Sequence, residues 1–444
     1  MHITRLITYT AISLCLIICT LSCESGQTAG TQGKNGTQAH TTTQGKSQPN
    51  KSQSNRGTVT LNEEPAPPQL PTLLGHYPAY AKNANIYEVN LINYTPEGTF
   101  NAFADHLPRL KAMGIDILAF LPLYDPSNLS HVNPQMGTID DLRALVKAVH
   151  KQRMKVIMTV DKLNDQNLTD QTSRKGVIDA LKYWASKLEI DGYYMADADQ
   201  VAESFWDEVY KALINTKQDL LMLAGGTVPR LKAKNYFHAD TGEQFNSMLT
   251  EIAKGQKGPQ DVVKQHKSSK QSRTKGFQLH YTSNHTLNSS LGPTSKTLGP
   301  AHDALAVLAY TIGGMPLMYG GQEEPLNKRL DHKKGNAIGF DKYLMEDWYQ
   351  TIFKTKHMNQ ALWNGEFGGE VEWMQVDDQI LSFKREKNGG VIYTVFNLSN
   401  TPATFESEIE VKRLMDTFNR RVVDLYKGTK IVMEPWTYKV YSNI

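Results

Sequence analysis

The chain has 444 residues, of which 40% are hydrophobic, and its 48 basic and 45 acidic side chains leave a formal net charge of +3. This length and composition are typical of a globular protein with a large core, and the even mixture of charge signs indicates no nucleic-acid partner. All three cysteines (Cys15, Cys19 and Cys23) lie at the start of the chain, which excludes a disulfide framework in the remainder.

Residues 1–23 are predicted to be an export signal. Arg5 precedes an apolar stretch that ends at Leu21 and is too short and too interrupted by Thr and Ser to span a membrane comfortably. The small serine before Cys23 resembles a bacterial lipobox, although Thr20 stands where leucine is usual. We therefore expect an exported protein of the cell envelope, anchored in a bacterial membrane by a lipid on Cys23. An ordinary secretory signal cleaved nearby is the alternative.

Residues 24–71 are predicted to form a disordered tether. The segment consists mainly of Thr, Gln, Gly, Lys, Ser and Asn, with few apolar side chains able to offset the entropy of ordering. It ends in the proline-rich run "EEPAPPQLP", which stiffens the approach to the folded part.

Residues 72–364 alternate short β-like runs with amphipathic helical runs, the pattern of βα units around a parallel sheet. The predicted strands are 86–91, 115–121, 155–160, 191–195, 220–225, 236–240, 277–282 and 315–320. One predicted helical stretch covers 99–114 and stops at Gly114, and another begins after Thr138 as N-cap. Eight such units predict an α/β fold, a (β/α)₈ TIM barrel, whose usual size is about 250 residues.

Residues 365–444 change character. Short alternating runs such as "ILSFKRE" and "GGVIYTVFNLS" are separated by turn residues, which predicts a small C-terminal antiparallel β-sandwich domain.

Several segments together resemble the α-amylase family, glycoside hydrolase family 13. They are "NIYEVNLINYTPEGTFNAFADHLPRLKAMGIDILAFLPLY", "VNPQMGTIDDLRALVKAVHKQRMKVI", "YTSNH", "GGMPLMYGGQEEPLNKR" and "EPWTYKVY", in the family's order. The resemblance runs from about Leu73 to Ile444. It implies a barrel followed by a β-sandwich, and a retaining mechanism with a nucleophile and an acid/base about 5 Å apart. The family's nucleophile, acid/base and third acid follow barrel strands 4, 5 and 7.

All three of these carboxylates are replaced in this chain. The family's strand-4 motif, Gly-aromatic-Arg-x-Asp, corresponds to "GYYMA", so that Ala196 takes the nucleophile's place and Tyr194 that of the arginine. Trp206 falls where relatives place a Phe-Trp pair and supports this register. Gly225 stands for the acid/base and Thr286 for the third acid. The resemblance therefore indicates a degenerate member with no catalytic residue.

The loops around the expected cleft are short. The family's insertion after strand 3 has shrunk to about "DQNLTDQTSR", and the loop after strand 2 to "YDPSNLSHVNP". The motif that ends strand 3 is also lost. We expect a shallow, open cleft rather than a pocket that excludes water.

Three nearby acids are interpreted as bystanders. Asp197 should face away from the barrel axis if the strand continues, whereas Asp199 and Glu203 lie in the following loop and near a helix N-terminus. No ligand cluster accompanies "DAD", so neither a metal site nor a cofactor is predicted.

Sugar binding is assigned to Tyr194, Asn284 and His285, because Tyr194 occupies a position that faces substrate in the family and the family's matching histidine bonds a sugar hydroxyl. Our main hypothesis is a catalytically inactive, amylase-like lipoprotein of carbohydrate metabolism. Its partners would be an α-glucan or maltooligosaccharide, or a protein that docks on it. One alternative is an active α-glucan hydrolase using displaced carboxylates, and another is a structural scaffold without a sugar site.

Overall fold

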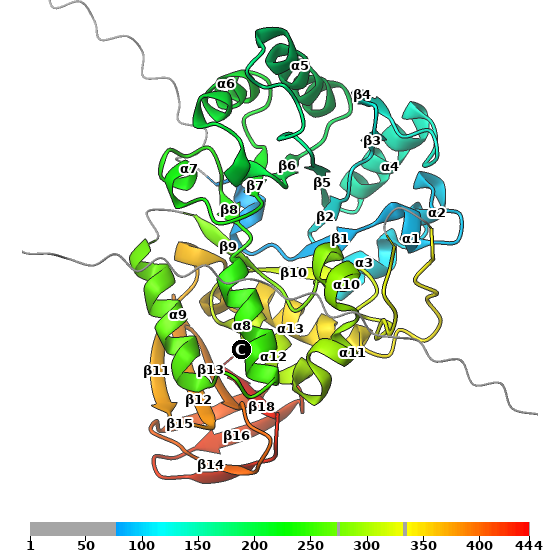
Figure 1. Cartoon of the computed structure of the whole chain (residues 1–444). Coiled ribbons are helices and arrows are strands. Elements are labelled where there is room, and N and C mark those ends of the chain that lie inside the picture. The colour runs from blue at the N-terminus through cyan, green and yellow to red at the C-terminus, as the bar shows by residue number, and fades with distance from the viewer. Residues whose placement is uncertain (1–76, 273–275, 332–334, 444) are drawn as a thin grey trace, which may run out of the picture. The chain divides into compact units, whose positions relative to one another are not determined.

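The computed structural model describes residues 77–272, 276–331 and 335–443 (Figure 1), all within the compact unit Gln69–Ile444. Its centre is a closed barrel of eight parallel strands in the order β1-β10-β9-β8-β7-β6-β5-β2. These strands are β1 (Ile86–Val89), β2 (Ile117–Phe120), β5 (Lys155–Val160), β6 (Gly192–Met195), β7 (Leu221–Ala224), β8 (Ala239–Asp240), β9 (Phe277–His280) and β10 (Met315–Tyr319). The predicted (β/α)₈ barrel is confirmed. The predicted signal peptide with Cys23 and the tether lie outside the described residues.

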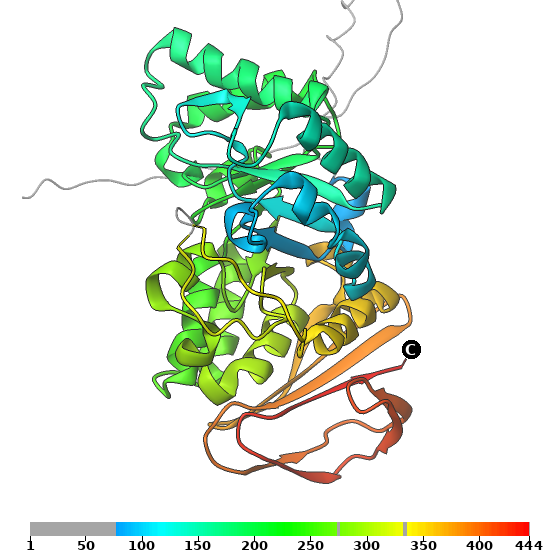
Figure 2. The same cartoon turned by 90° about the vertical axis from the view of Figure 1, so that its right-hand side faces the viewer.

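Helices surround this barrel (Figures 1 and 2). They are α1 (Leu91–Tyr94), α2 (Phe100–Ala104), α3 (Leu107–Met113), α4 (Ile139–Lys151), α5 (Gln171–Lys187), α6 (Glu203–Ile214), α7 (Pro229–Ala233), α8 (Glu243–Ala253), α9 (Pro259–Ser272), α10 (His285–Leu291), α11 (Thr294–Thr297), α12 (His302–Thr311) and α13 (Glu346–Met358). Short 3₁₀ turns are η2 (Ala79–Lys82), η3 (Ala198–Gln200), η4 (Gly299–Ala301), η5 (Gln360–Leu362) and η6 (Gly365–Phe367). None of the described helices has the length and apolar character needed to cross a membrane.

The helical stretch expected over 99–114 is two helices, α2 and α3, rather than one. Pro108 lies in the first turn of α3, where its missing N–H costs nothing, but it could not continue a helix from α2 because its ring would clash with the carbonyl of Ala104. The apolar face is nevertheless buried as expected. Gly114 caps α3 with φ of 98°, a left-handed conformation that favours glycine.

The predicted start of α4 is confirmed. Thr138 accepts a hydrogen bond from the backbone N–H of Asp141, and the Asp141 carboxylate accepts one from the N–H of Thr138. This reciprocal capping box satisfies donors that the first turn leaves open and sets the helix against the barrel.

Apolar side chains fill both the barrel and the layer around it. Alternation along the strands directs one set inward. These side chains are Ile86, Ile117, Ala119, Ile157, Leu221, Leu223, Ala239, Phe277, Leu279, Met315 and Leu317, and they form one cluster with Ala81, Ala84 and Tyr281. The other set packs against the helices in a larger cluster. The barrel is therefore a packed core, and its sites must lie where the strands end.

Two smaller sheets contain the remaining strands. The antiparallel hairpin β3 (Tyr124–Asp125) and β4 (Asn128–Val132) follows β2. At the C-terminus, a six-stranded antiparallel sheet in the order β11-β12-β13-β18-β15-β16 lies with the pair β14-β17 around a third apolar cluster. These strands are β11 (Glu370–Val376), β12 (Ile380–Lys387), β13 (Gly390–Asn397), β14 (Ala403–Glu406), β15 (Val411–Asp416), β16 (Arg421–Leu425), β17 (Lys430–Met433) and β18 (Tyr438–Ser442). The predicted C-terminal β domain is confirmed.

Candidate functional site at the barrel mouth

The carboxyl ends of the eight parallel strands meet at one face of the barrel, the mouth, where catalytic groups of this fold are held. Ala196 follows β6, Gly225 follows β7, and Asn284 and His285 follow β9. The structure thus brings the sequence-predicted positions to one face.

The residue that directly follows β6 is Ala196, which has no polar side chain. Ala196 extends the ladder by one residue, donating its N–H to the carbonyl of Val160 at 2.9 Å. The chain then turns into η3, which buried Trp206 holds by donating its indole N–H to the carbonyl of Ala198 at 3.1 Å. Trp206 thereby stabilises the local turn that follows Ala196.

Asp197 is the nearest acid along the chain. Burial raises the pKa of its carboxyl above the ordinary value, assisted by the negative charge of Asp161, while the backbone N–H of Lys162 acts in the opposite direction. Among the described residues, nothing bonds the buried Oδ2 of Asp197. A partly buried acid with a raised pKa thus lies beside the loop that follows β5.

Position 225 is sterically closed. A Cβ on Gly225 would overlap the carbonyl oxygen of Ala196 and lie 2.7 Å from its carbonyl carbon. The next residue, Gly226, has φ of 77°, and a Cβ there would overlap the carboxylate of Asp199. The ends of β6 and β7 therefore approach too closely for any side chain at the acid/base position.

Asn284 and His285 are both engaged within the protein. The side chain of Asn284 caps α10 by accepting from the N–H of Leu287 at 2.8 Å. His285 donates through Nδ1 to Glu88 Oε1 and through its backbone N–H to Glu88 Oε2, each at 2.8 Å. Burial alone would lower the pKa of His285, but the charge and hydrogen bond of Glu88 outweigh it and raise the pKa. His285 Nε2 lies 3.2 Å from the hydroxyl of Thr286.

Tyr194 lies in β6, one residue before the strand ends. It is partly buried and packs against the inner apolar cluster, which contains Tyr281. Burial raises the pKa of Tyr194, as do the neighbouring Tyr281 and Glu88. Its hydroxyl therefore lies among polar groups of the mouth. Such groups can donate and accept hydrogen bonds.

Glu88 was missed by the sequence reasoning. It lies in "IYEVNL", an apolar run, and only 3% of it is exposed. A charged residue alternating with apolar ones inside a barrel strand is the signal that could have identified it, because an unpaired buried carboxylate is costly.

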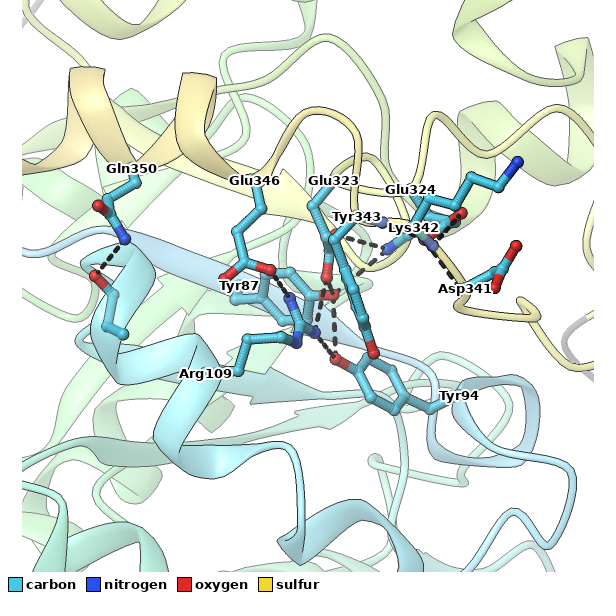
Figure 3. Close-up of polar contacts among 12 residues, drawn as sticks. Tyr87, Tyr94, Arg109, Glu323, Glu324, Asp341, Lys342, Tyr343, Glu346 and Gln350 are labelled. Atoms are coloured by element: carbon cyan, nitrogen blue, oxygen red, sulfur yellow. Dashed lines mark hydrogen bonds and ion pairs between the residues drawn. The ribbon is translucent and has the colours of Figure 1, made fainter.

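The loop after β10 is fastened by a second buried carboxylate, Glu323. Its Oε1 accepts from the hydroxyl of Tyr87 at 2.6 Å and from Nη2 of Arg109 at 2.9 Å. Figure 3 shows Arg109 between Glu323, Glu346 and the ring of Tyr343, whose centroid is 4.3 Å from the guanidinium carbon. This network joins the loop and the start of α13 to α3, so this side of the mouth is rigidly built.

A pocket of about 530 Å³ lies beside the mouth, at the ends of β1, β2 and β5. Its walls come from the segment after β1, the β3-β4 hairpin, the loop after β5 and one residue of α5. The short loops after β2 and β5 thus enclose a hollow, where the sequence indicated only a shallow, open cleft. Within the described residues, no group of three His, Cys, Asp or Glu side chains is arranged to hold a metal ion.

Comparison with known proteins agrees with this architecture. No family model matches the chain. It is 20% identical over 394 residues to the α-amylase MalA of Haloarcula japonica, covering 74% of this chain and 57% of that protein. It is also 20% identical over 399 residues to an intracellular maltogenic amylase of Bacillus subtilis, covering 74% and 66%. A shorter match, 34% over 84 residues, is to a malto-oligosyltrehalose trehalohydrolase of Deinococcus radiodurans, covering 17% and 14%. The chain therefore spans less than two thirds of each of these relatives.

Solved structures extend the likeness over the whole fold. An α-amylase of Geobacillus thermoleovorans complexed with acarbose superposes with a TM-score of 0.69 at 18% identity, covering 82% of this chain and 98% of that one. The maltogenic α-amylase AmyB of Thermotoga neapolitana gives 0.70 at 16%, covering 82% and 99%. AmyP in complex with maltose gives 0.70 at 13%, covering 82% and 97%. With its barrel and its C-terminal β domain, the chain has the fold of the α-amylases, and it is similar in sequence to amylases.

Proposed function

We propose that this protein binds an α-glucan or maltooligosaccharide on its amylase-type barrel without hydrolysing it. The main observation behind this proposal is that the three positions aligned with the family's catalytic carboxylates hold other residues. Ala196, Gly225 and Thr286 provide no carboxylate, and Gly225 has no room for any side chain.

The magnitudes support inactivity by the family's mechanism. A positioned acid/base contributes about 10² to 10⁴ in rate, and electrostatic stabilisation of developing charge contributes about 10² to 10³ per group. Without carboxylates at the nucleophile, acid/base and third-acid positions, the mouth lacks the groups that form the covalent intermediate and protonate the leaving oxygen in that mechanism. The fold is retained while the chemistry is not, and fold alone does not imply function.

Sugar binding is supported by two observations. The mouth contains tyrosine and histidine side chains, which suit sugar faces and hydroxyls. In addition, a structurally similar protein, AmyP, has been solved with maltose and with maltotriose.

A second candidate function, hydrolysis by displaced carboxylates, is favoured by Asp197. Its pKa is raised, as a general acid requires, and it lies near the ionisable Asp161. Against it, glycosyl transfer requires a nucleophile and an acid on opposite sides of the scissile bond, and both acids follow the neighbouring strands β5 and β6.

Reducing-sugar release from starch and maltotriose separates the two functions. We expect no release above that of buffer alone, from the wild-type protein or from Asp197→Asn. Asp179→Asn, which removes a half-exposed carboxylate on α5, is the matched control. Turnover by the wild type that disappears in Asp197→Asn and persists in Asp179→Asn would establish the hydrolase and contradict our proposal.

We further propose that the protein is exported and anchored through a lipid on Cys23. The proposal is supported by the lipobox-like end of residues 1–23 and by the polar tether that follows. In cells fed labelled palmitate, the wild type should carry the label and sediment with membranes, and Cys23→Ser should lose both properties. Cys19→Ser, a change four residues earlier, should keep them. An unlabelled wild type in the soluble fraction would refute the anchor.

A further inference from the structure

We propose that the glucan site is the pocket beside the mouth, at the ends of β1, β2 and β5, and that it takes one or two glucosyl units of a neutral maltooligosaccharide. This inference rests on the proposed function and deepens it. It also shifts binding away from Tyr194, Asn284 and His285.

The axis of the barrel is already filled. Tyr281 and Tyr319 are 4% and 2% exposed, and Glu88 lies with them among the buried side chains. Both oxygens of Glu88 are bonded to His285, and the side chain of Asn284 caps a helix. A sugar entering along the axis would have to displace these contacts.

The pocket beside it has the size and the apolar walls of a ligand site. Its volume of about 530 Å³ falls within the range of about 300 to 1,000 Å³ usual for small-molecule sites. Buried apolar side chains line it, namely Leu121, Met136, Val160, Leu163 and Val177. Exposed residues including Pro126, Ser127 and Gln166 form its rim. Such walls suit the C–H faces of a pyranose ring.

Asp161 provides a preorganised acceptor in this pocket. Its Oδ1 accepts from the hydroxyl of Tyr124 at 2.6 Å, and its backbone N–H donates to the same hydroxyl at 3.1 Å. These two bonds hold the carboxylate in place. Among the described residues, nothing bonds its Oδ2, which is therefore available to accept from a sugar hydroxyl.

Asn133 provides a hydrogen-bond donor that is held in place in the same pocket. Its side-chain oxygen accepts from the N–H of Gln135 at 3.0 Å, which directs the amide group, and only 7% of the residue is exposed. Within the described part of the chain, no group accepts from its Nδ2. A fixed acceptor and a fixed donor on apolar walls match a polyhydroxylated ligand. The carboxylates of Asp161 and Asp165, against the single cation Lys162, disfavour an anionic one.

Calorimetric titration with maltotriose tests the pocket. Leu129→Trp places an indole in the pocket from β4, while the backbone carbonyl of Leu129 keeps its bond from Trp184. Ser130→Trp is the matched control, because the next residue on the same strand lines a different depression. We expect the wild type and Ser130→Trp to bind alike and Leu129→Trp to bind at least tenfold more weakly. Asp161→Asn, which keeps the shape and removes the charge, should weaken binding about tenfold.

The outcomes distinguish this inference from the proposed function. Equal binding by the wild type and both pocket variants would overturn the pocket and leave glucan binding standing. No binding of maltotriose by the wild type at millimolar concentration would overturn glucan binding and the pocket with it, and would leave only a docking or scaffold role. If thermal unfolding shows that Leu129→Trp does not fold, the isosteric Asp161→Asn decides.

Discussion

The three positions that the resemblance aligns with catalytic carboxylates, Ala196, Gly225 and Thr286, differ in the room they leave for a larger side chain. Thr286 is exposed near the start of α10, so a carboxylate could be placed there without a clash. Gly225 lies against the backbone of Ala196, which is held by the barrel ladder and cannot move aside as a flexible side chain would. A side chain at position 225 is therefore excluded by the backbone geometry, whereas a change at position 286 concerns one exposed side chain.

This difference predicts the outcome of restoring each acid. Gly225→Glu should lower the free energy of unfolding by about 1–3 kcal/mol or more, because the new Cβ overlaps the carbonyl of Ala196. Thr286→Asp should change it by less than about 0.5 kcal/mol, as exposed substitutions usually do. Urea denaturation of both variants measures the difference. A Gly225→Glu protein as stable as Thr286→Asp would show that position 225 is open after all.

At the scale of elements, one buried carboxylate joins several pieces of the barrel just before β6. Asp191, 1% exposed, accepts from His150 Nε2 at the end of α4 at 2.6 Å and from Lys155 Nζ at the start of β5 at 3.0 Å. Lys217 Nζ and the backbone N–H of Val156 donate to it at 3.1 and 3.0 Å. Because these partners lie at the amino ends of the strands, the carboxylate stabilises the face opposite the mouth.

The titration of Asp191 makes the stabilisation from this cluster depend on pH. Burial would raise its pKa, but the hydrogen bonds from His150 and Val156 and the charge of Lys217 outweigh burial and hold the pKa well below the ordinary value. A folded-state pKa below the unfolded one, near 3.9, stabilises the fold at pH values above about 4. The stabilisation is then lost as the pH falls from that value through the lower folded-state pKa.

Asp191→Asn should therefore lower the free energy of unfolding at pH 7 by about 3–5 kcal/mol, the usual cost of breaking a buried ion pair. The difference from wild type should stay constant between pH 7 and pH 5 and shrink below about pH 4. Urea denaturation across this range measures it, with Asp179→Asn on the surface of α5 as the control. A difference that grew on acidification would contradict the assigned direction of the pKa shift.

At the scale of the whole described unit, Arg385 joins the C-terminal sheet to the barrel. This residue of β12 is 1% exposed and donates to the carbonyls of Thr311, Trp363 and Gly369 at 2.7, 3.1 and 2.8 Å. Thr311 ends α12, a barrel helix. The guanidinium group thus satisfies a carbonyl of a barrel helix and two carbonyls of the segment that leads into the C-terminal sheet. If the sheet separated from the barrel, these buried polar groups would be left unpaired.

Arg385→Met, which keeps much of the side chain's volume, should lower the free energy of unfolding by about 2–4 kcal/mol and reduce the cooperativity between barrel and sheet. Calorimetry should show one transition for the wild type and a broadened or split one for the variant. Lys384→Met, on the next residue of the same strand with a side chain 25% exposed, should leave the profile nearly unchanged. Two separate transitions already in the wild type would refute the coupling.

Features that depend only on residues close together in the sequence could be predicted from the sequence alone. The eight barrel strands, the capping box at Thr138 and the left-handed Gly114 follow from period, cap and turn chemistry within a few residues. The replacement of carboxylates at 196, 225 and 286 stays a prediction from the aligned register. The division of the stretch 99–114 into two helices also had a local cause in Pro108, whose ring excludes a continuous helix.

Contacts between distant residues could not be predicted in this way. Glu88 and His285 are 197 positions apart, and Tyr124 and Asp161 are 37 apart, so only closure of the barrel decides which groups are paired and which remain available. The same closure presses Gly225 against Ala196 and forms the pocket between the short loops. The sequence by itself determined the barrel and the C-terminal β domain, because both depend on local pattern. Only the tertiary structure decided where a pocket is left, because packing between strands and loops sets the space that remains.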